Sequence, residues 1–151
     1  MDTLTKEQRH KVMSGIRGKN TSIERKIRSV LHRAGFRFRI CDRRYPGSPD
    51  LVLPRYYAVI FVNGCFWHAH ENCDSFRMPK SNVVFWKKKF MRNKNRDKIV
   101  KEQYFERCWR VCTVWECAIR GKDSKKKIEN AAEQIVQWLD ESTDSELEIR
   151  N

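Results

Sequence analysis

The chain has 151 residues and a hydrophobic fraction of 40%, which suits one folded domain with a sizeable core and excludes a disordered protein. Lysine and arginine total 32 against 19 aspartate and glutamate residues, and the net charge of +13 favours a nucleic acid as partner, because neutralised phosphates release condensed counterions. A membrane surface fits less well, since no stretch approaches ~18 apolar residues. A basic protein without a specific ligand is the plain alternative.

The N-terminal segment is polar and lacks the apolar region of a secretory signal, so we expect a reducing, cytoplasmic location. Six cysteines in such a compartment serve better as metal ligands or small buried residues than as disulfides. Residues 5–17 are expected to form a short basic helix, which Gly-Lys-Asn at 18–20 ends.

Residues 21–35 predict an amphipathic helix. Thr21 and Glu24 have the spacing of a capping box, apolar residues then recur at helical spacing, and Gly35 ends the run. Three strands are predicted next, at residues 36–41, 51–54 and 56–64. The third is apolar enough to lie in the middle of a sheet.

Residues 81–107 predict a long basic helix, with a break expected near Asn93. Another strand is expected at 109–116 and a closing helix at 124–142, while the last ten residues, 142–151, are expected to be a disordered tail. This order of elements predicts an α/β fold, with a single domain at 21–141 built on a mixed β-sheet flanked by helices.

Four residues have the spacing of a zinc site. Cys65, His70 and Cys73 lie in one short loop, and Cys117 follows a later strand, which together make the tetrahedral Cys3His set that structural Zn²⁺ prefers. His68 is an alternative to His70, because both lie within reach in so short a loop. A second alternative treats Cys65 and Cys117 as buried thiols at strand ends.

Nucleotide deaminases also combine zinc with histidine and cysteine, but they carry H-x-E followed by P-C-x-x-C. Here Glu71 directly follows His70 and no P-C-x-x-C occurs, which excludes that class. The other three cysteines, Cys41, Cys108 and Cys112, lie in strand patterns and are expected in the core.

Asp50 follows a turn and opens a strand, a position from which a carboxylate can hold Mg²⁺ on a phosphodiester. PD-(D/E)xK nucleases place such an aspartate on one strand and Glu-x-Lys on the next. Here the second half is Phe61-Val62-Asn63, so the acid and the lysine are missing. Pro-Asp is also a common turn dipeptide, and a simple turn residue stays open as an alternative.

The larger pattern is more specific. The segments PGSPDLVLP, VIFVNGCFWHAH, FW at 85–86, NRD at 95–97 and WRVCTVWECAIRG occur in order. Over residues 5–121 the chain thereby resembles the very-short-patch repair (Vsr) endonucleases. The resemblance implies a restriction-endonuclease-like fold with a structural zinc site and Mg²⁺-dependent nicking of DNA 5′ to the thymine of a T:G mismatch, which arises when 5-methylcytosine deaminates. The degenerate second half of the motif is typical of that family.

The same resemblance implies the roles of the site residues. Asp50 is the metal-binding carboxylate, with the main-chain carbonyl of Val62 as a second Mg²⁺ ligand. His68 matches the family's essential histidine, which accepts a proton from the attacking water; a zinc-site role is its alternative. Glu24 and Asp97 match active-site carboxylates, although Glu24 also fills the capping box and Asp97 lies among basic residues that offer a simple salt bridge.

One position departs from the family, which often has a histidine where this chain has Asn63. Asparagine can donate a hydrogen bond to a phosphate or position a water, but it cannot deliver a proton at neutral pH. Protonation of the leaving group would then fall to metal-bound water.

By the resemblance, Phe66, Trp67 and Trp86 form a wedge that enters mismatched DNA, where unstacking costs less. On an extended segment Phe66 and Trp67 would point opposite ways, and Trp86 and Phe85 should divide between core and surface. Residues 1–20, including Lys19 and Asn20, would be a DNA-contacting arm. The basic run that begins at Lys87 is either a backbone contact or a solvated helix face.

The implied partners are double-stranded DNA with a T:G mismatch, a cytosine-5 DNA methyltransferase as a functional link, and mismatch-repair proteins. A monomer is expected, since no exposed apolar stripe is left over. The sequence leaves two other hypotheses open: a restriction-type endonuclease acting on paired DNA, and a non-catalytic, zinc-stabilised DNA-binding protein.

Overall fold

A computed structural model describes residues 5–8 and 22–151 of the protein, and within these ranges five strands form one sheet in the order β1-β2-β3-β4-β5. The strands are β1 (Arg39–Ile40), β2 (Leu51–Leu53), β3 (Ala58–Asn63), β4 (Arg110–Trp115) and β5 (Glu146–Ile149). The first three pair antiparallel, and β3, β4 and β5 pair parallel. The mixed sheet is thus confirmed, with the apolar strand β3 at its centre.

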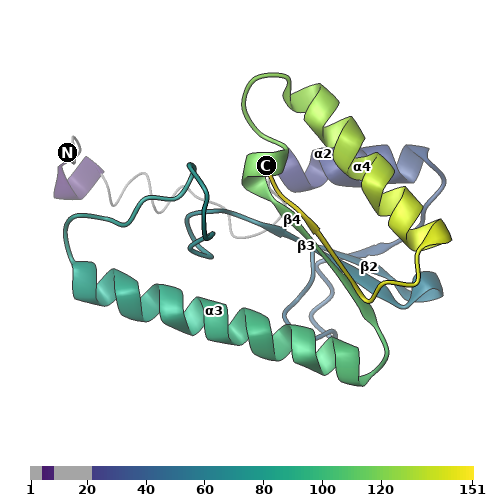
Figure 1. The fold of residues 1–151 in the computed structure, drawn as a ribbon, viewed down its shortest axis with the longest axis horizontal. Helices are drawn as coiled ribbons and strands as arrows, with labels where there is room; N and C mark the ends of the chain where they lie inside the picture. Colours follow the sequence, from purple (N-terminus) through teal and green to yellow (C-terminus); the bar gives the residue numbers. More distant parts are fainter. Residues whose placement is uncertain (1–4, 9–21) are drawn as a thin grey trace.

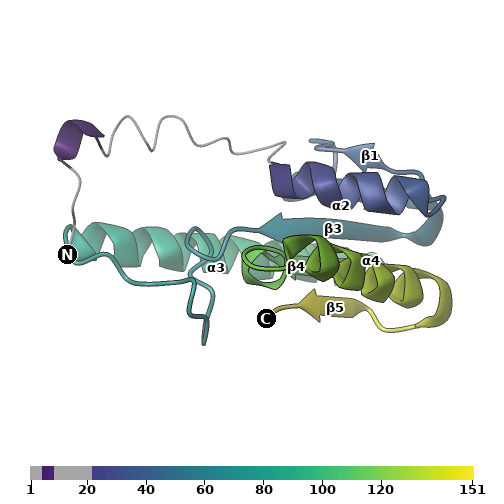
Figure 2. The ribbon, with the colours of Figure 1, turned by 90° about the horizontal axis from the view of Figure 1, so that it is seen from above.

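Helices cover both faces of this sheet (Figures 1 and 2). Helices α2 (Ser22–Arg33) and α4 (Ser124–Glu141) lie on one face, and α3 (Val83–Glu106) lies on the other. Single 3-10 turns follow β2 at Pro54–Tyr56 and β4 at Glu116–Ala118. None of the helices in the described ranges is long and apolar enough to cross a membrane.

The two sides of the sheet bury separate apolar cores, because successive side chains of a strand point to opposite faces. Ala58 and Ile60 of β3 pack with α2 and α4, whereas Val59 packs with Tyr104 of α3 and with Val111 of β4. Asp50, Asn63 and Thr113 continue this second set at two-residue intervals. These three polar residues therefore lie on the face of the sheet that α3 covers.

The first helix ends as its sequence predicts. The Gly35 N–H donates to the His32 carbonyl at 3.0 Å and the Phe36 N–H donates to the Leu31 carbonyl at 3.1 Å, which is a Schellman ending. Gly35 has φ of +99°, a backbone conformation that favours glycine. Thr21 lies outside the described residues, so the predicted capping box does too.

Helix α3 runs without the break expected near Asn93. The Asn93 side chain donates from Nδ2 to the Trp67 carbonyl at 2.8 Å, so it bonds to a distant loop and leaves its own backbone helical. Residues 6–8 are helical, with reciprocal side-chain bonds between Thr5 and Gln8. The rest of the helix predicted at 5–17 lies outside the described residues.

The expectation of a disordered tail at 142–151 is wrong. Residues 146–149 form β5, whose Leu147 and Ile149 join the core under α4. Arg150 then donates from Nη2 to the carbonyls of Glu71 and Asn72 at 2.7 and 3.0 Å. The backbone hydrogen bonds of β5 and the burial of its two apolar side chains outweigh the conformational entropy that is lost when this polar segment becomes ordered.

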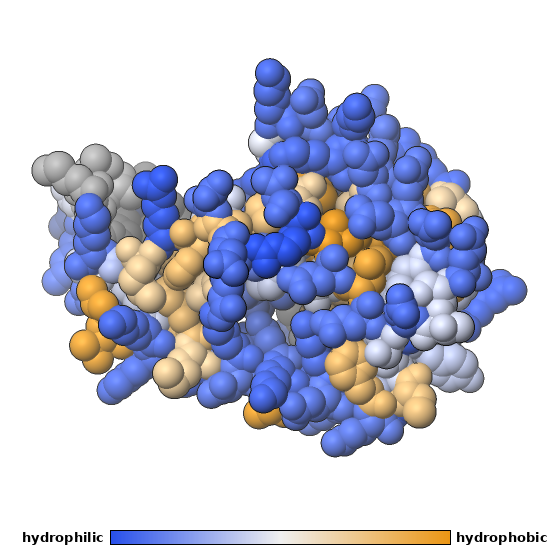
Figure 3. All heavy atoms as spheres, in the orientation of Figure 1, coloured by the Kyte–Doolittle hydropathy of each residue, from blue (hydrophilic) through white to orange (hydrophobic). Residues whose placement is uncertain are grey.

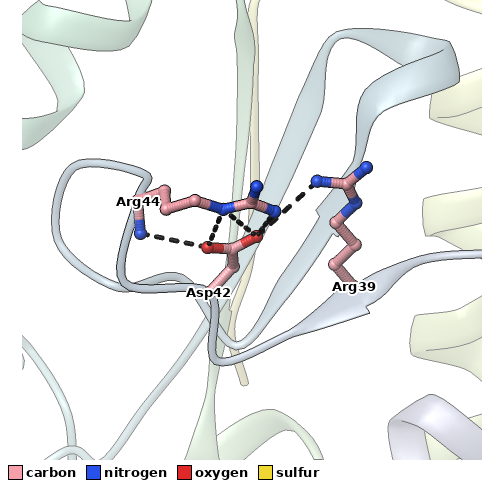
Figure 4. A network of polar contacts seen from close by, with 3 residues as sticks. All are labelled: Arg39, Asp42 and Arg44. Atoms are coloured by element: carbon pink, nitrogen blue, oxygen red, sulfur yellow. Dashed lines mark hydrogen bonds and ion pairs between the residues drawn. The ribbon is translucent and has the colours of Figure 1, made fainter.

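The segment between β1 and β2 is held by a local ion network (Figure 4). The Asp42 carboxylate accepts bonds from the Arg44 backbone and guanidinium at 2.7–3.3 Å, and Arg39 lies 3.9 Å away. The hydrogen bonds from Arg44 lower the pKa of Asp42 to about 2. The network shapes the turn that carries the chain from Cys41 to Asp50. Strand β1 itself is shorter than the strand predicted at 36–41.

Candidate functional site

The predicted metal-ligand residues come together in one cluster. Ligand atoms of Cys65, His70, Cys73 and Cys117 lie within 4.8 Å of one another, and the Cys117 sulfur is 3.6 Å from His70 Nδ1. Cys65, His70 and Cys117 are buried and Cys73 is half-buried. Such a buried set of three sulfurs and one imidazole matches the donors of a structural Zn²⁺ site.

The sheet explains why residues so far apart in sequence meet. Asn63 of β3 pairs with Trp115 of β4, and the ligands Cys65 and Cys117 each follow two residues later. A tight turn then brings His70 back, since its N–H donates to the Cys65 carbonyl at 2.9 Å. The pairing of two parallel strands thus places the distant fourth ligand.

Electrostatics at the cluster favour a bound cation. Burial raises the pKa of the Cys65 thiol to about 12, so a thiolate there needs a compensating positive charge. Burial also lowers the pKa of His70, which keeps the imidazole in the neutral form that ligates metals. The His70 ring stacks on Trp115 with centroids 3.7 Å apart, and this contact fixes its orientation.

The choice between the two histidines is resolved by position. His70 belongs to the cysteine cluster, whereas His68 Nδ1 lies 2.6 Å from Asp97 Oδ2 of α3. Among the described residues, Asp97 therefore pairs with His68 and not with its basic neighbours. When the carboxylate accepts from Nδ1–H, the other ring nitrogen of His68 remains a proton acceptor.

A cavity of about 410 Å³ lies beside this pair, on the α3 face of the sheet. The sequence-predicted residues that line it are Glu24, Asp50, Val62, Asn63, His68 and Asp97. They come from α2, the residue before β2, the end of β3, the following turn and α3. The fold thus brings all five predicted catalytic side chains to one cavity.

Asp50 is the most perturbed group of this cavity. Its Oδ2 accepts a 2.6 Å bond from the Val62 N–H, while burial, with Glu24 adding to it, raises its pKa to about 7. Glu24 is itself only 5% exposed although it lies in the first turn of α2. Two carboxylates this close together, one buried and one half-buried, fit a divalent cation, which would neutralise both.

The other residues that line the cavity were not assigned to the site from the sequence, and among them are Arg96, Lys101 and Thr113. Lys101 lies one helical turn beyond Asp97, and this spacing is the signal that could have found it. Its Nζ is 2.7 Å from Glu146 of β5, so the C-terminal strand also supports the cavity. Thr113 lies two residues before Trp115 on β4, and its place in the cavity can be recognised only when the register of the strands is known.

The aromatic residues beside the cluster form one group. The chain turns at 65–69, so Phe66 and Trp67 do not point opposite ways as expected for an extended segment; their rings meet edge-on with centroids 5.1 Å apart. The Phe66 ring also contacts Trp86 and Phe90, with both centroids 5.3 Å away. Trp86 packs against Phe90 and Phe85 is exposed, which confirms the predicted division of that pair.

This aromatic group reaches the surface near the start of α3. Phe66, Trp67 and Trp86 are half-buried, and Lys89 Nζ lies 5.3 Å from the centre of the Trp67 ring. Figure 3 shows a mostly hydrophilic face with apolar atoms over the first part of α3, where Val84 and Phe85 are exposed. Lys19, Asn20 and most of the predicted arm at 1–20 lie outside the described residues.

The cysteines outside the cluster behave differently from the prediction. Cys112 is fully buried as expected, but Cys108 is exposed in the turn after α3, and Cys41 is half-buried after β1. Both Cys41 and Cys108 have positive φ, so each sits where a strand or helix has just ended. The prediction that they lie in the core rested only on the strand-like composition of the sequence around them.

A mixed sheet with a Cys3His cluster beside a carboxylate–histidine cavity defines the protein as a restriction-endonuclease-like α/β domain with a zinc-type site. Comparison with known proteins narrows this class. A sequence model described as "DNA mismatch endonuclease Vsr" matches residues 1–75. The chain is 39% identical to the DNA mismatch endonuclease Vsr of Escherichia coli (strain K12) over 138 residues, which is 91% of this chain and 87% of that protein.

Two further relatives are type II nicking enzymes. The chain is 41% identical to V.XorIIP of Xanthomonas oryzae pv. oryzae, over 78% of this chain and 86% of the relative. It is 42% identical to V.NmeAIP of Neisseria meningitidis serogroup A, over 80% and 86%. The chain belongs to the DNA mismatch endonuclease Vsr family, which confirms the resemblance read from its motifs.

Proposed function

We propose that this protein is a DNA endonuclease that nicks one strand 5′ to the thymine of a T:G mismatch and so initiates very-short-patch repair. The observation that carries the proposal is that Glu24, Asp50, Asn63, His68 and Asp97 line one cavity. Family membership and the similarity to nicking enzymes support hydrolysis of one DNA strand. The net charge of +13 supports binding to the phosphate backbone.

Mg²⁺ is the cofactor that the cavity fits best, since hard carboxylate and carbonyl oxygens are its preferred ligands. Asp50 and the Val62 carbonyl are the proposed ligands. In a strand the N–H and C=O of one residue point to the same side, and the Val62 N–H already points at Asp50. When bound, the ion polarises the phosphodiester and lowers the pKa of a bound water.

The protein's own groups then position the reactants. His68, held by Asp97 at 2.6 Å, accepts a proton from the attacking water through its free ring nitrogen, and the Asp97 carboxylate stabilises the imidazolium that forms. Asn63 donates a hydrogen bond to a phosphate oxygen. The Cys3His cluster, proposed to hold structural Zn²⁺, fixes the loop on which His68 lies.

Recognition of the mismatch is proposed for Phe66, Trp67 and Trp86. Their rings form a packed, half-buried group that would separate base pairs, which costs a few kcal/mol per unstacked step and less at a mismatch. Residues 1–20, with Lys19 and Asn20, are proposed to contact the DNA. A cytosine-5 methyltransferase and mismatch-repair proteins are the proposed functional partners, and the protein is proposed to act as a monomer.

The test is a nicking assay with Mg²⁺ on two duplexes that differ only in carrying T:G or C:G at one position. We expect cutting of the T:G duplex alone, and loss of cutting but not of binding in Asp50→Asn. Asp140→Asn, exposed on α4 behind the sheet, is the matched control and should cut normally. Equal cutting of both duplexes would instead indicate a restriction-type enzyme, and binding without cutting would indicate a non-catalytic DNA-binding protein.

A further inference from the structure

A sulfur donor lies beside the carboxylates of Glu24 and Asp50. Cys41, Glu24 and Asp50 each place one ligand atom within 4.8 Å of the other two. Cys41 directly follows β1, and its N–H donates to the Asp50 carbonyl at 3.3 Å, so the antiparallel pairing of β1 and β2 holds the two residues together. A left-handed backbone conformation at Cys41, with φ of +47°, ends the strand there.

The separations suit a single ion. Zinc binds carboxylate oxygens at about 2.0–2.2 Å and thiolates at about 2.3 Å in tetrahedral geometry, so two ligands of one ion lie roughly 3.6 Å apart. Atoms within 4.8 Å of one another therefore need to close by roughly 1 Å at most, which rotation of the side chains can supply. Cys41 and Asp50 are both half-buried, which leaves room for such rotation and for a path from solvent.

An independent observation indicates that the adjoining cavity holds a polar occupant. Thr113 is only 2% exposed and lines the same cavity, and its hydroxyl has no hydrogen-bond partner among the described residues. Buried hydroxyls are normally satisfied, so a ligand, a water shell or a hydrated ion is expected beside it. Glu24 and Asp50 line the same cavity, and the negative charge of their carboxylates favours a cation as that occupant.

We propose that Glu24, Cys41 and Asp50 form a second divalent-cation site that binds Zn²⁺ and other thiophilic cations, and that such an ion excludes Mg²⁺ from Asp50. Thiolate ligands select zinc-type ions over magnesium, which prefers oxygen alone. The Cys41 thiol loses its proton when the Zn–S bond forms, as metal binding requires. This site shares no ligand with the Cys65–His70–Cys73–Cys117 cluster.

Metal content separates the two sites. Wild type, Cys41→Ser and Cys108→Ser are equilibrated with the same free Zn²⁺, and zinc per chain is measured by atomic emission. We expect two zinc ions for wild type and for Cys108→Ser, whose cysteine is exposed outside both groups, and one for Cys41→Ser. Any zinc held by surface histidines is the same in all three proteins, so it does not affect the difference in zinc content between them.

The size of the expected effect can be stated as a change in zinc affinity. Since loss of a residue that only orients a ligand costs about 10- to 100-fold in metal affinity, loss of the thiolate should weaken the second zinc at least about tenfold. Zinc content and affinity equal to wild type in both Cys41→Ser and Cys41→Ala would overturn the proposal, as would a single zinc in wild type. Cys41→Ala repeats the comparison should serine itself bind the ion.

Competition between Zn²⁺ and Mg²⁺ is measured in a separate nicking assay, and this part of the proposal rests on the proposed nicking function. At fixed Mg²⁺, the Zn²⁺ concentration that halves nicking should be at least about tenfold higher for Cys41→Ser than for Cys108→Ser. Zinc binding without inhibition would overturn the exclusion of Mg²⁺. A protein that nicks no duplex at all would contradict the proposed function, while the zinc count would still decide the site.

Discussion

Replacement of Asp97 by asparagine should remove the charge that holds His68 while leaving the shape of the pair intact. The 2.6 Å contact between His68 Nδ1 and Asp97 Oδ2 joins side chains that are 20% and 33% exposed. An asparagine at 97 can still accept a hydrogen bond, but it no longer neutralises an imidazolium. The expected defect is therefore in proton transfer and not in folding or DNA binding.

The magnitude follows from the kind of bond that is lost. Hydrogen bonds to charged groups contribute about 1.5–3 kcal/mol, and partial exposure of this pair favours the lower half of that range. Each 1.4 kcal/mol corresponds to a factor of ten. The single-turnover nicking rate of Asp97→Asn should thus fall roughly 10- to 40-fold.

The assay is single-turnover nicking of a T:G duplex at saturating Mg²⁺, with the dissociation constant for DNA measured in parallel. His68→Ala should lose about 10²- to 10⁴-fold, the usual contribution of a general base. If Asp97 acts through His68, the double variant His68→Ala/Asp97→Asn should be no slower than His68→Ala alone. Losses that add in the double variant, or an Asp97→Asn rate equal to wild type, would refute the reasoning.

Three other outcomes are expected. Because the raised pKa of Asp50, about 7, favours the protonated carboxyl below that pH, the Mg²⁺ concentration for half-maximal nicking should rise about tenfold per pH unit below 7 and stay flat above it. Cys117→Ser should release zinc and lose its cooperative thermal transition by circular dichroism, whereas Cys108→Ser should melt like wild type. Ile149→Ala in β5 should lower the free energy of unfolding in urea by about 2–4 kcal/mol, and the conservative Ile149→Val should cost about 1.

Local patterns in the sequence predicted much of the framework. Helical spacing of apolar residues located α2 and α4, and the apolar run at 56–64 located the central strand β3. These predictions succeed because residues within one or two turns, or along one strand, decide such elements. The Cys65, His70 and Cys73 spacing succeeded for the same reason, since a single loop brings those ligands together.

Predictions failed where a distant segment intervened. Asn93 stays helical because its side chain bonds to the Trp67 carbonyl, and the tail is a strand because β4 offers it an open edge and a buried position for Ile149. Cys41 was expected in the core because its neighbours alternate like a strand. Its place beside Glu24 depends on how α2 meets β1, which no local pattern records.

The sequence by itself determined the fold class, the excess of positive charge, the ligand types of the cysteine cluster and the residues to compare with the Vsr family. Only the tertiary structure decided which histidine joins which site. His68 and His70 are two residues apart and chemically alike, but the turn after β3 sends one to Asp97 of α3 and the other to Cys117 beyond β4. Composition and spacing set what each side chain can bind, whereas the packing of remote elements sets what it meets.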